Sequence, residues 1–184
     1  MTKQFNDIKA WYRDGQVFAY PTEAVYGLGC DPQNENAVHK ILNLKSRAVE
    51  KGMILIASDF IHIQEYVLFD ELPLTTQQTI LASWPGPVTW LLPKSSYTPK
   101  WISGDSDMVA VRLSAHPLVQ AICQYLQKPM VSTSANPAGQ PPATSIEEVK
   151  AYFGNKLNLI EGELGSQRSP SKIFHSLTME TIRS

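Results

Sequence analysis

One segment, residues 17–32, constrains the fold of this chain more than any other. It begins as an apolar run of strand character that stops at Pro21. Hydroxyl, carboxylate and phenol side chains and two glycines then follow before Pro32. Proline fixes the backbone and removes a hydrogen-bond donor, whereas glycine permits close approach or a positive φ. The pattern predicts a shaped loop at the end of a strand, which is where α/β proteins hold their ligands.

Length and composition indicate one globular domain over residues 1–184. The apolar fraction of 43% is ordinary for a globular protein, and a net charge of −1 excludes a uniformly basic nucleic-acid binder. No apolar run reaches the roughly 20 residues that span a bilayer, and the N-terminus lacks the apolar core of a signal peptide. We therefore expect a soluble cytoplasmic protein without a membrane segment.

The cysteine and histidine patterns argue against a structural metal site. Cys30 and Cys123 are far apart and outside any CxxC motif, which favours reduced thiols over a disulfide framework or structural zinc. The four histidines show no metal-ligand spacing. The sequence thus predicts no metal held by protein side chains, and it is compatible with a divalent ion carried by a substrate.

Apolar periodicity predicts alternating helices and strands. Helical spacing occurs at residues 2–14, 34–45, 60–67, 75–84, 116–126 and 145–153, and strand character at residues 17–20, 52–58, 88–92, 108–113, 129–132, 157–160, 173–177 and 178–182. Residues 17–58 form an expected strand–helix–strand unit, and residues 94–107 an expected mobile loop. The fold class is a single α/β domain with a mixed sheet.

A basic cluster lies at the C-terminal end of the second predicted helix and just after it. Lys40, Lys45, Arg47 and Lys51 occur in a stretch with almost no acidic residues. Such a cluster suits phosphate, because lysine supplies a point charge and arginine a bidentate fork. The alternative is a solvated helix end whose cations favour the helix dipole. The chain has no GxxxxGK[ST] loop, so side-chain cations would contribute more than usual to nucleotide binding.

Arg112 lies inside an otherwise apolar strand, where an unpaired charge would be very costly. A carboxylate ligand would suit it, but a structural ion pair with Asp31, Glu23 or another acid is the more frequent solution. Glu23 itself could act as a base, orient a substrate amine or form a stabilising hydrogen bond.

A second polar turn follows the strand at residues 129–132. Ser132, Ser134 and Asn136 are short donors and acceptors, although such a turn often has no further role. Ser134 lacks a GxSxG elbow, and Cys30 has no identifiable base nearby. Covalent catalysis is therefore weakly supported.

Taken together, these segments resemble the YrdC/TsaC family of threonylcarbamoyl-AMP synthases, in its single-domain form. The resemblance extends over nearly the whole chain. It rests on residues 20–31, the Lys45-x-Arg47 pair with Lys51, and residues 84–89, 109–112 and 132–136.

The resemblance implies a twisted mixed β-sheet with helices on both faces around a positively charged cleft. It also implies an enzyme that condenses L-threonine, bicarbonate or CO2, and ATP to threonylcarbamoyl-AMP and pyrophosphate. Mg²⁺ would arrive with ATP. The product would pass to downstream threonylcarbamoyl-transferase proteins for the modification of an adenosine in tRNA, and tRNA or double-stranded RNA is a further expected partner.

The resemblance also implies roles for individual residues. Lys45, Arg47 and Lys51 would face the ATP phosphates, with Lys45 and Arg47 as the catalytic candidates. Ser134, Asn136 and Arg183 would hold the nucleotide. The residues expected around threonine are Thr22, Arg112, Ser132 and Ser171.

Two other functions fit the same residues. An RNA-binding module without catalysis could use the same basic cleft, and its binding would depend strongly on salt. A related enzyme could instead use another carbamoyl compound, such as carbamoyl phosphate.

Overall fold

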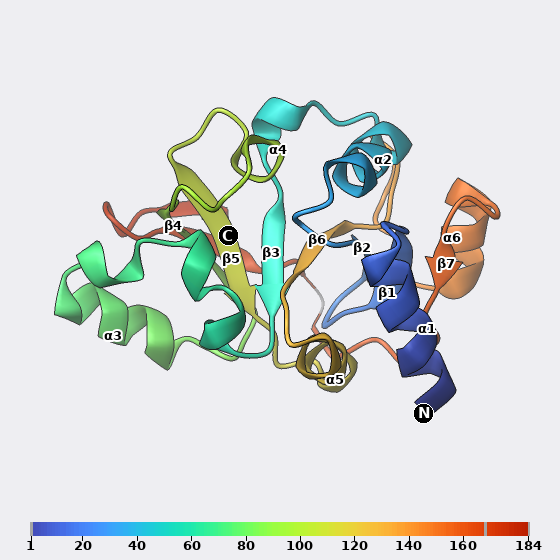
Figure 1. The fold of residues 1–184 in the computed structure, drawn as a ribbon, viewed down its shortest axis with the longest axis horizontal. Helices are drawn as coiled ribbons and strands as arrows, with labels where there is room; N and C mark the ends of the chain where they lie inside the picture. The colour runs from blue at the N-terminus through green and yellow to red at the C-terminus, as the bar shows by residue number, and fades with distance from the viewer. Residues whose placement is uncertain (1, 168, 184) are drawn as a thin grey trace.

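The computed structural model describes residues 2–167 and 169–183. Within these residues, nine strands form a single mixed sheet in the order β7-β1-β2-β6-β3-β5-β4-β8-β9 (Figure 1). The strands are β1 Phe18–Pro21, β2 Tyr26–Gly29, β3 Ile54–Ala57, β4 Val88–Pro93, β5 Met108–Leu113, β6 Met130–Ser134, β7 Asn158–Leu159, β8 Lys172–His175 and β9 Thr181–Arg183. The α-helices are α1 Thr2–Arg13, α2 Glu35–Lys45, α3 Leu74–Ala82, α4 Lys100–Ser103, α5 Pro117–Leu126 and α6 Ile146–Phe153. The predicted α/β class with a mixed sheet is confirmed.

Strand β3 occupies the middle of the sheet, parallel to β5 and antiparallel to β6. Its side chains alternate between two apolar clusters: Leu55 belongs to one and Ile56 to the other. Such burial on both faces explains the continuous apolar run in the sequence. The strand predicted at residues 52–58 is confirmed.

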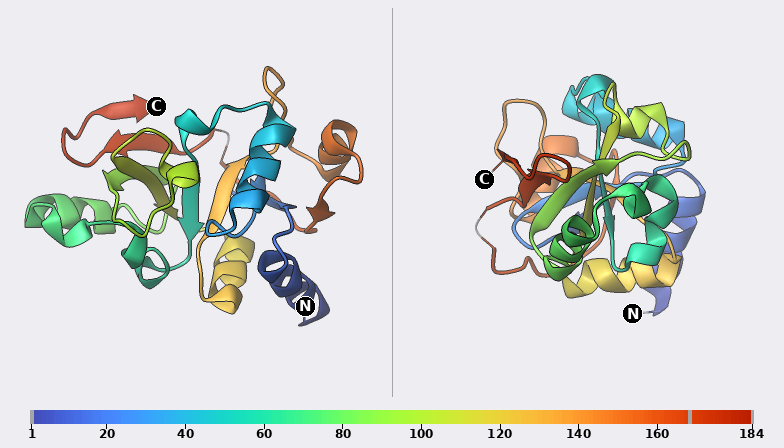
Figure 2. Two further views of the ribbon diagram at one scale, coloured as in Figure 1. Left: turned by 45° about the horizontal axis from the view of Figure 1, so that its top comes forward. Right: turned by 90° about the vertical axis from the view of Figure 1, so that its left-hand side faces the viewer.

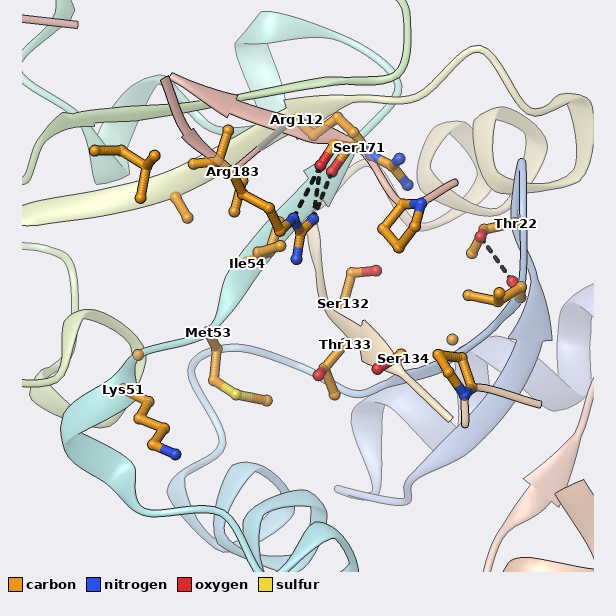
Figure 3. Close-up of a pocket in the computed structure, with 18 of the residues that line it drawn as sticks. Thr22, Lys51, Met53, Ile54, Arg112, Ser132, Thr133, Ser134, Ser171 and Arg183 are labelled. Atoms are coloured by element: carbon orange, nitrogen blue, oxygen red, sulfur yellow. Dashed lines mark hydrogen bonds between the residues drawn. The ribbon is translucent and has the colours of Figure 1, made fainter. Parts of the chain in front are cut away.

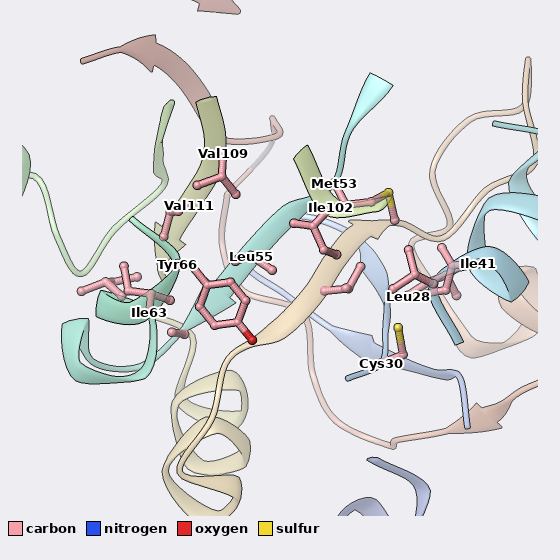
Figure 4. Packing of buried hydrophobic residues seen from close by; sticks show 14 of the residues in the cluster. Leu28, Cys30, Ile41, Met53, Leu55, Ile63, Tyr66, Ile102, Val109 and Val111 are labelled. Carbon is pink, nitrogen blue, oxygen red and sulfur yellow. The ribbon is translucent and has the colours of Figure 1, made fainter. Parts of the chain in front are cut away.

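The two clusters lie on opposite faces of the sheet, so helices cover both faces (Figures 1 and 2). One cluster joins Leu28, Leu55 and Val111 to Ile41 of α2 (Figure 4). Helices α1 and α5 cover the other face. Fully burying each of these side chains contributes about 1.5–3 kcal/mol. The fold therefore depends on both faces of the sheet.

The segment that follows β1 differs from the predicted loop. After the turn at residues 22–25 the chain forms β2, which pairs antiparallel with β1. The Thr22 amide and hydroxyl both donate to the Val25 carbonyl, at 3.1 and 2.7 Å, and close this hairpin. Because the chain turns back at once, β2 and β6 separate β1 from β3. The expected strand–helix–strand unit over residues 17–58 is present in chain order as β1, α2 and β3, with the additional strand β2 between β1 and α2.

Two further segments were predicted incorrectly. Residues 60–67 form the short 3₁₀ turns η2 Phe60–His62 and η3 Gln64–Tyr66 in place of one helix. The Asp59 side chain caps η2 by accepting from the Ile61 amide at 3.0 Å, but no side chain caps η3. Residues 94–107, predicted to be a loop, contain α4, whose carbonyl at Ile102 accepts from the Met53 amide at the start of β3. No helix in the described part of the chain is long and apolar enough to cross a membrane.

Helix α2 begins with a side-chain cap at Asn34. The Asn34 side chain accepts a hydrogen bond from the Ala37 amide at 3.0 Å. We predict that Asn34→Ala lowers the free energy of unfolding by about 1 kcal/mol, because this amide loses its partner. Urea denaturation would measure the change. Asn34→Asp keeps an acceptor and should retain most of the stability, and equal losses in both variants would contradict the capping role.

Candidate active site

A cavity of about 440 Å³ opens on the face of the sheet that α1 and α5 leave partly uncovered. This volume is in the range of small-molecule sites. Thr22 follows β1, the second strand of the order, and Arg183 lies on β9, the last strand, yet both line the cavity (Figure 3). The sheet therefore curves around the cavity.

Cationic side chains dominate the charged part of the wall. Among the described residues that line the cavity, Arg47, Lys51, Arg112 and Arg183 are positive, and Glu23 is negative. Burial lowers the pKa of Arg47 and of Arg183, but arginine keeps its charge at any ordinary pH. The wall thus favours an anionic ligand.

Glu23 forms a buried ion pair with Arg112. Its Oε2 accepts from Arg112 Nη2 at 3.0 Å, and its Oε1 accepts from the Ser114 hydroxyl at 2.6 Å and the Ala115 amide at 3.2 Å. Burial raises the pKa of Glu23, but Arg112 and Ser114 outweigh it and hold the pKa below the ordinary value. The carboxylate is therefore ionised, and the ion pair with Glu23 considered above is present.

This pair leaves most of the Arg112 guanidinium available. Within residues 2–167 and 169–183, the Arg112 guanidinium makes one hydrogen bond, from Nη2 to Glu23. A guanidinium carries five N–H donors in a planar fork that fits a carboxylate. Glu23 can therefore hold Arg112 in place while the remaining donors face a ligand in the cavity.

Arg47 and Lys51 lie where α2 gives way to β3. Arg47 Nη2 donates to the Gly52 carbonyl at 2.9 Å, which fixes the guanidinium beside the start of the strand. Lys51 extends along the rim of the cavity (Figure 3). Lys51 lies across the cavity from Thr22 (Figure 3). The contact with Gly52 places Arg47 beside the start of β3 as well, so the wall provides two separate positive regions.

The third cation of this cluster, Lys45, lies behind the wall. Its ammonium donates to the Ser134 carbonyl, to the Asn136 carbonyl at 2.9 Å and to Asn136 Oδ1 at 3.2 Å. Asn136 Oδ1 also accepts from the Ser134 hydroxyl at 2.6 Å. Burial, and then the charge of Arg47, lowers the pKa of Lys45 to about 8. Lys45 thus fastens α2 to the Ser134–Asn136 turn.

The C-terminal strand closes the cavity through Ser171. Arg183 Nη2 and Nε donate to the Ser171 carbonyl at 2.7 and 3.2 Å, and the Ser171 hydroxyl lies 2.8 Å from that of Thr89 on β4 (Figure 3). Ser132, on β6, points into the same space and accepts from the Tyr20 phenol at 2.9 Å.

The structure therefore brings together most of the residues expected from the sequence. The cavity is lined by Thr22, Arg47, Lys51, Arg112, Ser132, Ser134, Ser171 and Arg183, whereas Lys45 and Asn136 stand directly behind it. Sequence reasoning missed Ser103 and Ser106, which lie in the segment expected to be a loop, and the apolar wall of Ile54, Leu91, Met108 and Ile173. The period-two pattern of Met108, Ala110 and Arg112 was the available signal for that wall.

A comparison with known families decides the relationship of this chain. The family model for Sua5/YciO/YrdC domains, described as "Telomere recombination", matches residues 10–184. The chain belongs to this family. The Sua5/YciO/YrdC assignment agrees with the resemblance stated from the five sequence segments.

Relatives within the family carry a specific name. A protein of Pseudoalteromonas atlantica is 55% identical over 172 residues, which cover 94% of this chain and 92% of that protein. One of Acinetobacter baumannii is 49% identical over 177 residues, covering 93% of each. Both are named threonylcarbamoyl-AMP synthase.

A solved structure of the family has a related fold. The structure of P. abyssi Sua5 complexed with L-threonine is 32% identical, with a TM-score of 0.86 over 95% of this chain. This chain spans about half the length of that one, 51%. The twisted α/β fold expected from the family resemblance is confirmed.

Proposed function

We propose that this protein is a threonylcarbamoyl-AMP synthase, an enzyme that condenses L-threonine, bicarbonate or CO2, and ATP to threonylcarbamoyl-AMP and pyrophosphate. The main support is a single cavity. It is lined by the Arg112 guanidinium and by the cations Arg47, Lys51 and Arg183. An amino-acid carboxylate and a polyphosphate both need such partners. The names of relatives with about half of their residues identical support the proposal.

The region around Arg112 suits threonine. The donors of Arg112 that Glu23 leaves available would take the amino-acid carboxylate, and Thr22, Ser132 and Ser171 supply hydroxyl groups to the same cavity. P. abyssi Sua5, which shares the fold, has been solved with L-threonine. We assign this half of the cavity to the amino acid.

The region around Arg47 and Lys51 suits the phosphates of ATP. Arg183 and Ser134 face the same cavity from the other walls, and Lys45 with Asn136 would act by holding Ser134 in place. The described residues contain no cluster of three or more side chains suited to a metal, and Glu23 already accepts three hydrogen bonds. Mg²⁺ would therefore be held by the phosphates of ATP, whose charge it would neutralise.

The reaction needs positioning and charge neutralisation more than a covalent intermediate. The neutral threonine amine forms a bond to the carbon of CO2 as one C–O π bond opens to an oxyanion. The nitrogen then loses a proton to solvent, which gives a carbamate. A carbamate oxygen then forms a bond to the α-phosphorus as the bond to the pyrophosphate oxygen breaks. Both partners are anions, so the surrounding cations lower the barrier by stabilising the charge and by holding the reacting atoms together.

The wider roles follow from this reaction. We infer that the product passes to transferase proteins that modify tRNA, and that the protein acts in the cytoplasm. The comparisons favour the synthase over an RNA-binding module without catalysis. Direct contact with tRNA or double-stranded RNA remains part of the proposal.

Pyrophosphate release tests the function. We expect release from ATP and Mg²⁺ when both threonine and bicarbonate are present, and none when either is omitted. Mass spectrometry should find threonylcarbamoyl-AMP among the products. Equal release without threonine, or release with carbamoyl phosphate in place of threonine and bicarbonate, would contradict the proposal and favour the related carbamoyl enzyme.

A further inference from the structure

The phenol of Tyr20 connects the core of the sheet to the cavity. The side chain is fully buried on β1, among the residues that α1 and α5 cover. Within the described residues its hydroxyl has one hydrogen-bond partner, Ser132 Oγ on β6 at 2.9 Å. Burial raises the pKa of Tyr20, so the phenol stays protonated. Tyr20 is therefore a permanent hydrogen-bond donor to Ser132.

Two glycines make this contact geometrically possible. Strand β2 lies between β1 and β6, and Gly27 on β2 is paired directly opposite Tyr20. A Cβ at Gly27 would lie 3.2 Å from Tyr20 Cζ, and one at Gly29 would lie 2.8 Å from Tyr20 Cε1. The ring thus crosses β2 over backbone that carries no side chains. This gives a physical reason for the two glycines of the Gly27-Leu28-Gly29 sequence.

The contact with Tyr20 keeps the Ser132 proton from pointing toward the phenol. A serine hydroxyl has one donor and two acceptor lone pairs. Tyr20 occupies a lone pair, and within residues 2–167 and 169–183 no acceptor is paired with the Ser132 hydroxyl proton. Since Ser132 lines the cavity (Figure 3), its proton is available to a ligand there.

The register of the sheet places Ser132 between the two positive regions. Ile54 on β3 pairs with both Ser132 and Ala110, whereas Arg112 pairs with Ile56. Ser132 is therefore displaced from Arg112 by two residues along the strands, about 6–7 Å. The displacement is toward the start of β3, which Arg47 and Lys51 precede. If the threonine carboxylate binds Arg112, the carbamate formed on the threonine nitrogen lies beside Ser132 when it is directed at the ATP phosphates.

We propose that Tyr20 is a positioning residue that fixes Ser132 as a hydrogen-bond donor to the carbamate oxygen formed from the amino acid. The inference rests on the proposed function. Ser132 touches the reacting group, and Tyr20 acts through Ser132. The donor stabilises the carbamate while its other oxygen attacks the α-phosphorus, so its loss lowers kcat more than it raises the KM for threonine.

The first test replaces the phenol by a ring without a hydroxyl. Tyr20→Phe keeps the packing over both glycines and should lower kcat by about 10-fold, the effect of one oriented donor. The KM values for ATP and threonine should change by less than about twofold. Kinetics would be measured from pyrophosphate release with each substrate varied in turn.

Tyr12→Phe provides a matched control. Tyr12 belongs to the same buried cluster, and its phenol donates to the Pro129 carbonyl at 2.9 Å, away from the cavity. Both substitutions remove one buried hydroxyl, so similar losses of thermal stability are expected. Tyr12→Phe should retain the wild-type kcat. Equal slowing in both variants would show a structural effect and overturn the inference.

A double-mutant cycle tests whether Tyr20 acts through Ser132. If it does, Tyr20→Phe should slow the reaction no further once Ser132→Ala is present. Losses that multiply would overturn the inference, as would an unchanged kcat in Tyr20→Phe. Absence of turnover in the wild type would overturn the proposed function together with the inference. If the wild type turns over normally and a variant gives one of the contradictory results above, the inference about Tyr20 is overturned and the proposed function is not.

Discussion

The Arg112→Ala variant is expected to raise the KM for threonine by about 100-fold, the loss of a charge-assisted, two-point contact with the carboxylate. The KM for ATP should change by less than about threefold, because the phosphate region is formed by Arg47, Lys51 and Arg183. Steady-state kinetics with each substrate varied at saturating levels of the other would separate the two effects.

The buried ion pair complicates this variant and defines its control. Both side chains of the pair are about 10% exposed, and removing one partner of a buried pair costs about 3–5 kcal/mol of stability. Arg112→Lys keeps a cation beside Glu23 but loses the planar fork. It should therefore retain more stability than Arg112→Ala while still raising the KM for threonine. Equal increases in the KM for threonine and ATP in either variant would point to a structural role.

The main elements of the fold were predictable from apolar periodicity. The continuous apolar run predicts β3, which is buried on both faces, and the amphipathic spacing of apolar residues predicts α2 and α5. Strand β2 was not predictable in the same way, because glycine disfavours strands in isolation. Its glycines are explained by the ring of Tyr20, which lies across the neighbouring strand. That explanation requires the strand pairing, which local sequence does not contain.

The chemistry of the site was more predictable than its geometry. The basic cluster indicated an anion site, but Lys45, Arg47 and Lys51 are so close in sequence that local pattern did not separate their roles. The apolar face of α2 contains the distinction: Lys45 follows Ile41 and Leu42 at helical spacing and is buried with them. A lysine in such a position needs acceptors nearby, and here the Ser134–Asn136 turn supplies them.

The burial of Lys45 predicts that ATP binding weakens as pH rises through about 8. Below its pKa of about 8, the ammonium has three N–H donors for the three oxygens of the Ser134–Asn136 turn. Above it, the neutral amine has two donors and a lone pair facing an oxygen. Ser134 then loses its fixed orientation, and we expect the Kd for ATP to rise by about 10-fold between pH 7.5 and 9. Calorimetry without threonine or bicarbonate would measure it.

Two variants of α2 test whether Lys45 causes this pH dependence of ATP binding. Lys45→Met should bind ATP at least about 10-fold more weakly at pH 7.5, with little further change up to pH 9, since three buried oxygens lose their donor. Lys40→Met alters a cation of α2 that lies outside the cavity, and it should keep the affinity and pH profile of the wild type. Parallel profiles in the wild type and Lys45→Met would assign the pH dependence to another group.

Stability should respond to pH in the opposite direction, which separates loss of binding from unfolding. The folded state holds the pKa of Lys45 near 8, below the ordinary value of 10.5. Between these values the unfolded chain binds the proton and the folded chain does not, so this group alone makes the free energy of unfolding rise with pH. Urea denaturation of the wild type and Lys45→Met at pH 7.5 and 9 would measure its contribution. If the wild type loses stability relative to Lys45→Met over this interval, the pKa of Lys45 is not lowered, and weaker ATP binding has another cause.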